Sequence, residues 1–465
     1  ILLLAVLLRV GVALYLGDFV DAPPLLTDQR SYHALGERLI NGHGFSFAAN
    51  WYPFTPANAP TAHWSFLQSL YIAGVYTLFG VHPLAARLVT AILGGLLLPW
   101  LVFRLTRRAF PPPSAINNQQ LTISSSLPLL AALLAALYPY FILYSATLMT
   151  ETGFLIALLW SLERGLALGQ VAKKGEAIHT RQWVWHALTL GLALGVATLF
   201  RQSILPWAPV LFLWLLWVAW RTRRMLPLRM LAALTVAGLL LLACIMPFTL
   251  RNYRVYGQFL LLNSNAGYAM YSAQHPMHGT EFREFDAAPL PLDILAEGLN
   301  EAQLDRALMS IGIGFVLAEP GRYLLLSLSR VKDYFEFWPT PDTTLLHNLG
   351  RSASFGLLLP FMLYGLFLAV RTGAYARQSG GEQSPGWQRW LDFSTTGPAL
   401  LLLFVLFYSI LHILTWAFPR YRLPVDAVLM SFAALGLLDV LQRLARWTKW
   451  RLGKGAQVVK QEGQP

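Results

Sequence analysis

Two acidic side chains stand where a very apolar chain could use them for chemistry. Asp28 follows the hydrophobic stretch at residues 1–17, and Tyr32 lies one helical turn after it. Glu151 is the single charge on the short turn at residues 144–151. A carboxylate at membrane depth is costly to keep, and such residues usually have a function. Asp28 and Glu151 are therefore candidate catalytic residues, with a general base or a metal ligand as the chemistry they suit.

Each carboxylate also has a purely structural interpretation. Asp28 or Thr27 could cap the helix that follows, and Glu151 could offset the dipole of the next helix. A capping residue needs no long folded loop around it, whereas the loop at 18–82 is long enough to form a cleft. The catalytic interpretation therefore stands beside the structural one.

Arginines follow the apolar segments at three places. They are Arg201 in ATLFRQS, Arg251 and Arg254 in PFTLRNYRVYG, and Arg420 and Arg422 in PRYRLP. A guanidinium group matches the oxygens of a phosphate, so a phosphate-bearing lipid head group is the predicted ligand. As an alternative, each arginine could be an interfacial anchor that reaches toward lipid phosphates on its own.

Other site chemistry has weaker support. The histidines His33, His43, His63, His82, His275 and His278 have no spacing typical of a metal site, so surface or packing roles are the default. The one cysteine, Cys244, lies in an apolar run, which excludes a disulfide framework and a multi-cysteine metal site. No phosphate-binding loop or dinucleotide fingerprint occurs. We predict no metal ligand and no required cofactor, and leave open a divalent ion between Asp28 and Glu151.

The composition places the chain in a membrane. It has 465 residues, of which 56% are hydrophobic and 12% charged, with a mean hydropathy of +0.50. Segments inside a bilayer must satisfy their own backbone groups, so each long apolar run is predicted to be a helix. The sequence predicts an all-α polytopic membrane protein with about ten spans, at 1–17, 83–103, 127–143, 152–169, 184–200, 203–220, 229–248, 353–370, 397–416 and 423–441. The apolar but short segment 64–80 is predicted to lie at the membrane interface.

The distribution of basic residues predicts the orientation. Lysine and arginine are roughly threefold denser in one set of loops, which should face the cytoplasm together with both termini. The opposite face holds the two long connections, 18–82 and 249–352, and 16 of the 23 acidic residues. Much of the net charge of +12 is then positive-inside charge near anionic lipid, and no nucleic-acid partner is implied.

The order of these motifs resembles the membrane-embedded GT-C glycosyltransferases that use polyprenyl-phosphate sugars. The resemblance is to bacterial protein O-mannosyltransferases and lipid A aminoarabinose transferases, in the style of glycosyltransferase family 39. It rests on Asp28 with Tyr32, on SFLQSLYIAGVYTLFG leading into HPLAARLVTAILG, on Thr150-Glu151, on PFTLRNYRVYG, and on RYRLP at 420–424.

The resemblance implies a donor, a fold and a set of roles. It implies a GT-C helix bundle in the plasma membrane that moves a sugar from a polyprenyl-phosphate carrier to an unknown acceptor on the outer face. The implied displacement inverts the anomeric centre. Asp28 and Glu151 would be catalytic, and the residues Tyr32, Arg201, Arg251, Asn252, His275, Arg420 and Arg422 would bind substrate. The expected regions are a catalytic module at 1–248, an outer region at 249–352, and C-terminal helices with a cytoplasmic tail at 353–465.

The sequence departs from those relatives at three motifs. The entry to the interfacial helix reads APTAHWSFLQ, where many relatives have a Pro-rich stretch. Asp28-Gln29 stands where protein O-mannosyltransferases have an Asp-Glu pair, and Gln274-His275 replaces an Asn-rich pattern. The acceptor, whether lipid, glycan or protein, therefore stays open.

Two other functions compete with a transferase. A transporter or flippase for lipid-linked sugars would also want interfacial arginines, but it would need polar residues through the spans, which are poor in charge. A noncatalytic subunit of a surface-glycan assembly complex could use the long loops to bind partners, and it would tolerate loss of Asp28.

Overall fold

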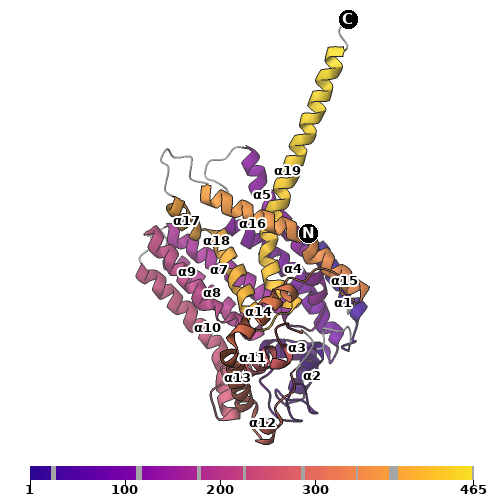
Figure 1. Cartoon of the computed structure of the whole chain (residues 1–465), viewed down its shortest axis with the longest axis vertical. Coiled ribbons are helices and arrows are strands. Elements are labelled where there is room, and N and C mark those ends of the chain that lie inside the picture. Colours follow the sequence, from indigo (N-terminus) through magenta and orange to yellow (C-terminus); the bar gives the residue numbers. More distant parts are fainter. Residues whose placement is uncertain are drawn as a thin grey trace.

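The described part of the structure consists of helices and the irregular segments that connect them. A computed structural model describes residues 1–21, 28–111, 118–174, 180–223, 227–283, 288–341, 344–375 and 386–462 (Figure 1). Within these ranges the only β pairing consists of two isolated bridges, Ser46 with Pro60 and Trp51 with Thr55. The predicted all-α class is confirmed.

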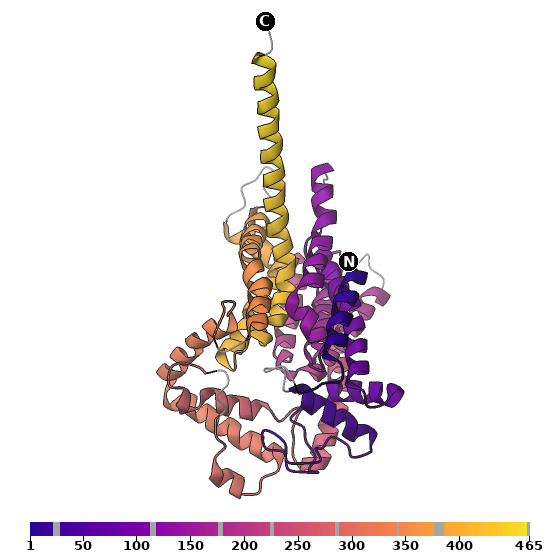
Figure 2. The ribbon, with the colours of Figure 1, turned by 90° about the vertical axis from the view of Figure 1, so that its right-hand side faces the viewer.

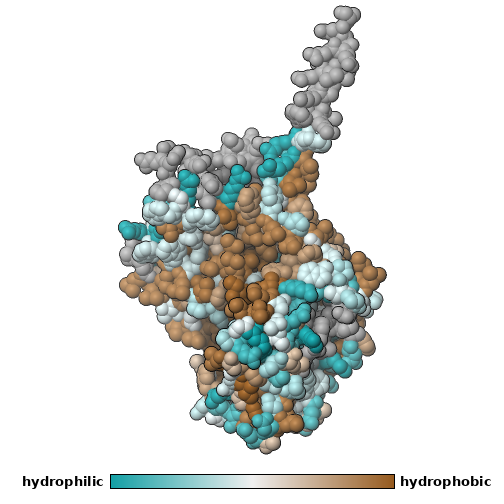
Figure 3. Space-filling model, viewed as in Figure 1, coloured by the Kyte–Doolittle hydropathy of each residue, from teal (hydrophilic) through white to brown (hydrophobic). Residues whose placement is uncertain are grey.

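Eight helical segments of the described part are long and apolar enough to cross a membrane. They are built on α4 (Pro83–Ala109), α7 (Glu151–Lys174), α8 (Thr180–Phe200), α9 (Trp207–Thr222), α10 (Pro227–Tyr256), α16 (Leu357–Tyr375), α18 (Gly397–Leu414) and α19 (Leu423–Glu462). Counting two bent helix pairs as spans brings the number to ten. Hydrophobic residues cover the middle of the bundle in Figure 3, and hydrophilic residues gather at its lower end. The chain is a multi-pass membrane protein.

Two of the ten predicted spans differ from a single long helix. The segment predicted at 127–143 is the end of α5 (Asn118–Leu137) followed by α6 (Pro139–Ser145), with a bend of 59° between them. Pro139 has no N–H to continue the helix and disfavours helical geometry at the residue before it.

The first predicted span forms α1 (Leu2–Leu16), and the predicted interfacial segment forms α3 (Phe66–Phe79); both are short apolar helices.

The long connection at 249–352 is mostly helical. It contains α11 (Ala266–Gln274), α12 (Leu292–Ala296), α13 (Glu301–Ala318), α14 (Pro320–Tyr334) and α15 (Leu345–Arg351). The apolar helices α13 and α14 meet at an angle of 104°. The sequence did not predict this bent helix pair. Figures 1 and 2 show α11, α12 and α13 at the same end of the bundle as α2 (Asp28–Ile40) and α3, opposite the projecting end of α19.

The buried carboxylate of Glu301 fastens the two long connections to each other. It accepts hydrogen bonds from Thr55, Thr61 and the backbone N–H of Ala62 in the first connection, and from Ser264 in the second. The bond from the Ala62 N–H is 2.7 Å long. Four donors on one buried carboxylate hold both segments at a fixed place above the spans.

Replacing Glu301 by Ala should lower the free energy of unfolding by about 3 kcal/mol, because several buried donors lose their acceptor together. Glu297→Ala is the matched control, since Glu297 is exposed at the end of α12. The measurement is the midpoint of thermal denaturation in detergent. Equal midpoints for the two variants would show that Glu301 does not join the connections.

Helices α16 and α19 pack with their backbones in close contact. A Cβ atom added at Gly365 would lie 1.8 Å from the carbonyl oxygen of Phe432, and one at Gly436 would lie 2.4 Å from that of Phe361. Only glycine fits at such crossings. This packing fixes the start of α19, and with it the segment at 416–422 that reaches the site described next.

Candidate active site

A cavity of about 1540 Å³ lies where the two long connections meet the ends of the spans. Its charged end is lined by Asp28 and Tyr32 of α2, by Arg201 after α8, and by Arg420 before α19. These four residues are far apart in the sequence and all belong to the predicted site. The helix bundle therefore gathers them at one place.

The first ion pair in the cavity joins Asp28 to Arg420. The Arg420 Nη2 atom lies 3.0 Å from Asp28 Oδ2, and the two side chains are 17% and 28% exposed. Asp28 is the first residue of α2, where a carboxylate is favoured by the helix dipole. Thr27, the other predicted cap, lies outside the described residues. Asp28 therefore stands at a helix N-terminus and also faces a guanidinium group in the cavity.

The second ion pair joins Glu151 to Arg201. The Arg201 Nη2 atom lies 2.5 Å from Glu151 Oε1, and Arg201 Nε donates to the Thr150 hydroxyl at 2.9 Å. Glu151 is the first residue of α7 and is only 2% exposed. Its other oxygen, Oε2, is buried without a hydrogen-bond partner in the described part of the chain. Glu151 itself does not line the cavity, but its partner Arg201 and the preceding residue Thr150 do.

The ring of Tyr421 links the two ion pairs. The guanidinium carbon of Arg201 lies 5.3 Å from the ring centroid, and that of Arg420 lies 5.4 Å from it. Both arginines thus contact one aromatic ring by cation–π interactions. The ring keeps the two cations close together without neutralising either of them.

Burial controls the titration of the neighbouring loop and helix residues. Burial and the charge of Asp28 raise the pKa of the Tyr32 hydroxyl above its usual value, so Tyr32 is neutral at pH 7. Burial lowers the pKa of His63 to about 4, so its imidazole is also neutral at pH 7. Neither side chain adds charge to the two ion pairs.

Several buried polar atoms around the cavity have no partner among the described residues. They are the indole nitrogens of Trp64 and Trp416 and one ring nitrogen each of His63 and His412, and all four side chains line the cavity. Buried polar groups are normally hydrogen-bonded, and the cost of leaving them unpaired is substantial. These atoms are available to a polar ligand in the cavity.

The other wall of the cavity is apolar and belongs to the spans. It is formed by Ala208 and Phe212 of α9, and by Gly238, Leu241 and Leu242 of α10. The cavity therefore runs from the side chains of Asp28, Arg201 and Arg420 to a hydrocarbon-like surface between two membrane helices.

Arg251 and Asn252, both predicted to bind substrate, lie outside the cavity lining. Arg251 packs over the rings of Phe45, Phe66 and Tyr256 and donates to the Asn252 side chain. The Asn252 amide in turn donates to the backbone oxygens of residues 260 and 262. In this structure the two residues hold the chain as it leaves α10.

His275 and Arg422 are also placed away from the lining. His275 accepts a hydrogen bond from the Met277 N–H and so caps a short turn. Arg422 is fully buried, with Nε 3.0 Å from Asp426 Oδ1 and Nη1 on the Tyr334 carbonyl. Arg420 and Arg422 occupy a 3-10 turn, in which residues two apart point in different directions.

Apart from Tyr32, the sequence did not predict a role in the site for the aromatic and histidine side chains around the cavity. Tyr421 stands within RYRLP, a motif that carried the resemblance, and Trp64 directly precedes another, whereas Trp416 and His412 have no distinguishing pattern around them. Among the described residues, no group of three or more histidine, cysteine or acidic side chains is arranged to hold a metal ion.

Comparisons with known proteins give matches only at the level of structure. No protein-family model matches the sequence, and no curated protein matches it. The oligosaccharyltransferase of Archaeoglobus fulgidus, solved with a tethered acceptor peptide, is similar with a TM-score of 0.55 and 15% sequence identity. The match covers 96% of this chain and 50% of the archaeal one, so the chain spans about half the length of that protein.

A second match is to ArnT of Cupriavidus metallidurans, solved with bound undecaprenyl phosphate. Its TM-score is 0.38 and its sequence identity 14%, over 94% of this chain and 76% of that one. With eight to ten candidate membrane spans, an all-helical architecture and this likeness to the archaeal structure, the chain has the GT-C fold.

Proposed function

We propose that the protein is a glycosyltransferase that moves a sugar from a polyprenyl-phosphate carrier to an acceptor. One observation carries the proposal: a single cavity joins Arg201 and Arg420 to an apolar wall between two membrane helices. A polyprenyl phosphate likewise has a charged part and an apolar part, since it joins an anionic phosphate head to a hydrocarbon tail. Its phosphate suits Arg201 and Arg420, and its tail suits the surface of α9 and α10.

The two cations also suit the leaving group of the reaction. As the bond between sugar C1 and the phosphate oxygen breaks, negative charge grows on the phosphate, and fixed guanidinium groups beside it lower the barrier. The acceptor hydroxyl attacks C1 and loses its proton to the Asp28 carboxylate, which acts as general base. One displacement at C1 inverts the anomeric centre. Glu151 is then a positioning residue, which holds Arg201.

The unpaired polar atoms of the cavity support a sugar as the transferred group. The indole N–H groups of Trp64 and Trp416 can donate to sugar oxygens, and the aromatic rings near them can pack on the less polar face of a sugar ring. The archaeal protein with the same fold is an oligosaccharyltransferase that carries an acceptor peptide in its structure. The proposal extends that class of activity to this chain, with its own acceptor open.

The proposal includes the orientation inferred from basic residues. The cavity would open to the outer face of the plasma membrane, and both termini would lie in the cytoplasm. The reacting groups would come from both the 1–248 and 353–465 regions, since Arg420 belongs to the latter.

The direct test is turnover by the purified chain in liposomes that contain defined polyprenyl-phosphate sugars and candidate acceptors. A transferase releases polyprenyl phosphate and glycosylates the acceptor. A flippase moves the intact donor between leaflets and releases nothing. Release of polyprenyl phosphate is expected, and donor translocation without release across the donor panel would contradict the proposal.

A further inference from the structure

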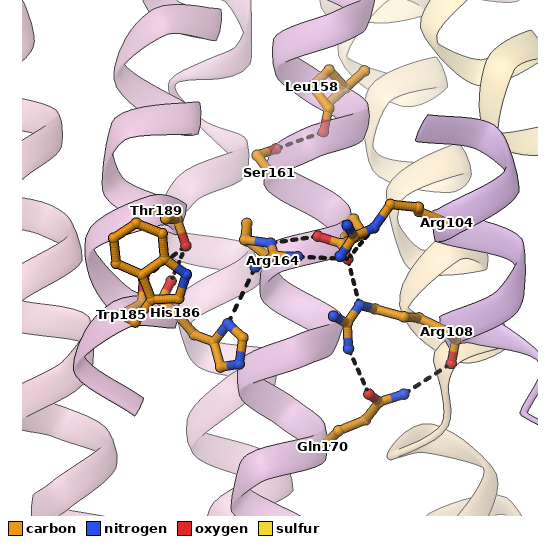
Figure 4. Close-up of polar contacts among 10 residues, drawn as sticks. Arg104, Arg108, Leu158, Ser161, Arg164, Gln170, Trp185, His186 and Thr189 are labelled. Atoms are coloured by element: carbon orange, nitrogen blue, oxygen red, sulfur yellow. Dashed lines mark hydrogen bonds and ion pairs between the residues drawn. The ribbon is translucent and has the colours of Figure 1, made fainter. Parts of the chain in front are cut away.

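A second cluster of charged side chains lies at the other end of the bundle, away from the cavity. Three arginines share one carboxylate there: Arg104 and Arg108 of α4, and Arg164 of α7, all bonded to Glu163. Figure 4 shows the arginine side chains of the two helices converging on one place. The mechanism proposed for the cavity uses none of these groups.

The positive charges in this cluster are only partly balanced. Glu163 Oε1 accepts from Arg104 Nη2 at 2.8 Å, from Arg108 Nε at 2.5 Å, and from Arg164 Nη2 at 2.7 Å. Glu163 is the one carboxylate that forms an ion pair with these arginines in the described ranges. Three guanidinium groups on a single carboxylate leave a formal surplus of two positive charges.

The neighbours of the cluster add no negative charge. Arg108 Nη1 donates to the uncharged Gln170 side chain, and Arg164 Nη1 contacts the ring of His186, which carries no negative charge in either protonation state. The carboxylate is 1% exposed, whereas the Arg104 and Arg108 side chains are 34% and 27% exposed. The surplus charge therefore reaches the surface through Arg104 and Arg108.

The cluster lies at the depth of a lipid head group. Arg104 is about 31 Å along α4 from Pro83, close to the thickness of a hydrocarbon core. Its guanidinium lies 5.0 Å from the ring centroid of Trp100, and Trp100 and Trp185 are both largely exposed. Exposed tryptophans are typical of the boundary between hydrocarbon and head groups.

We infer that Arg104 and Arg108 bind the phosphate of an anionic phospholipid head group at this end of α4, α7 and α8. Guanidinium groups match phosphate oxygens, and an anion there relieves the repulsion among three cations held on Glu163. Basic sites between membrane helices are known to suit such head groups. The inference is independent of the reaction proposed for the cavity.

The test measures lipid binding to the purified full-length chain by native mass spectrometry in a neutral detergent. The probes are phosphatidylglycerol, phosphatidylcholine and inorganic phosphate. Phosphatidylglycerol should bind more tightly than phosphatidylcholine, and Arg104→Gln and Arg108→Gln should each weaken it by about fivefold. Arg107→Gln is the matched control, because Arg107 is exposed on the same turn of α4 and makes no ion pair with Glu163 in the described structure.

Three results would overturn the inference. They are equal weakening by Arg107→Gln and Arg104→Gln, equal binding of the two lipids, and competition by inorganic phosphate as effective as by lipid. The thermal midpoint of each variant in neutral detergent checks its folding, and Arg104→Lys, which retains the charge, should keep most of the binding. If Arg104→Gln does not fold, the comparison of Arg108→Gln with Arg107→Gln decides.

Discussion

Replacement of Asp28 by Asn is expected to lower the turnover number for sugar transfer by about 10²- to 10⁴-fold, the usual contribution of a positioned general base. The substitution keeps the size of the side chain and removes its ability to accept the proton of the attacking hydroxyl. Binding of the donor should change little, because Arg201 and Arg420 both remain. The measurement is polyprenyl phosphate release at saturating donor, together with the dissociation constant of polyprenyl phosphate.

Asp21→Asn is the matched control for Asp28→Asn. Asp21 also pairs with an arginine, with its Oδ1 atom 2.6 Å from Arg30 Nε, but both side chains are about half exposed and neither lines the cavity. An exposed pair contributes little to stability or to the site, so this variant should keep its activity. Unchanged turnover in Asp28→Asn would return Asp28 to the role of a residue at a helix N-terminus.

Replacement of Arg201 by Gln is expected to remove activity and to destabilise the protein by about 3–5 kcal/mol, as for other buried ion pairs that lose one partner. Glu151 is almost fully buried, so its charge would lose the partner that balances it. The donor phosphate would also lose one of its two cations. Thermal denaturation in detergent and donor binding measure the two effects separately.

A double variant separates stability from function at this pair. Arg201→Gln combined with Glu151→Gln carries no unbalanced charge and should recover much of the lost thermal midpoint. Its donor binding should stay weak, because the cation is still absent. Recovery of donor binding along with the midpoint would show that Arg201 serves only to balance Glu151.

Apolar run length and charge predicted the helical class and most of the spans, because a bilayer permits few other structures. The same features could not show the break at Pro139 or the sharp turn between α13 and α14, which depend on local backbone geometry and on packing above the membrane. The sequence also could not predict the hydrogen bonds by which Glu301 joins the two long connections, because the donor residues lie about 40 and 240 positions away from it.

The candidate site was predictable where an unusual charge marks it. Glu151, Arg201 and Arg420 stand out in apolar surroundings, and Asp28 is among the first charges after the first apolar segment. The structure pairs the four residues two by two. Arg422 has the same sequence signal as Arg420 but turns toward the buried Asp426. Which of two nearby arginines faces the cavity is set by a 3-10 turn, and an arginine-rich motif alone does not specify it.

The most direct test of the account is a cryo-electron-microscopy structure of the protein with bound polyprenyl phosphate. The account predicts density for the phosphate between the guanidinium groups of Arg201 and Arg420, with the first isoprene units along the wall formed by α9 and α10. A phosphate bound elsewhere, with the cavity free of lipid, would contradict it.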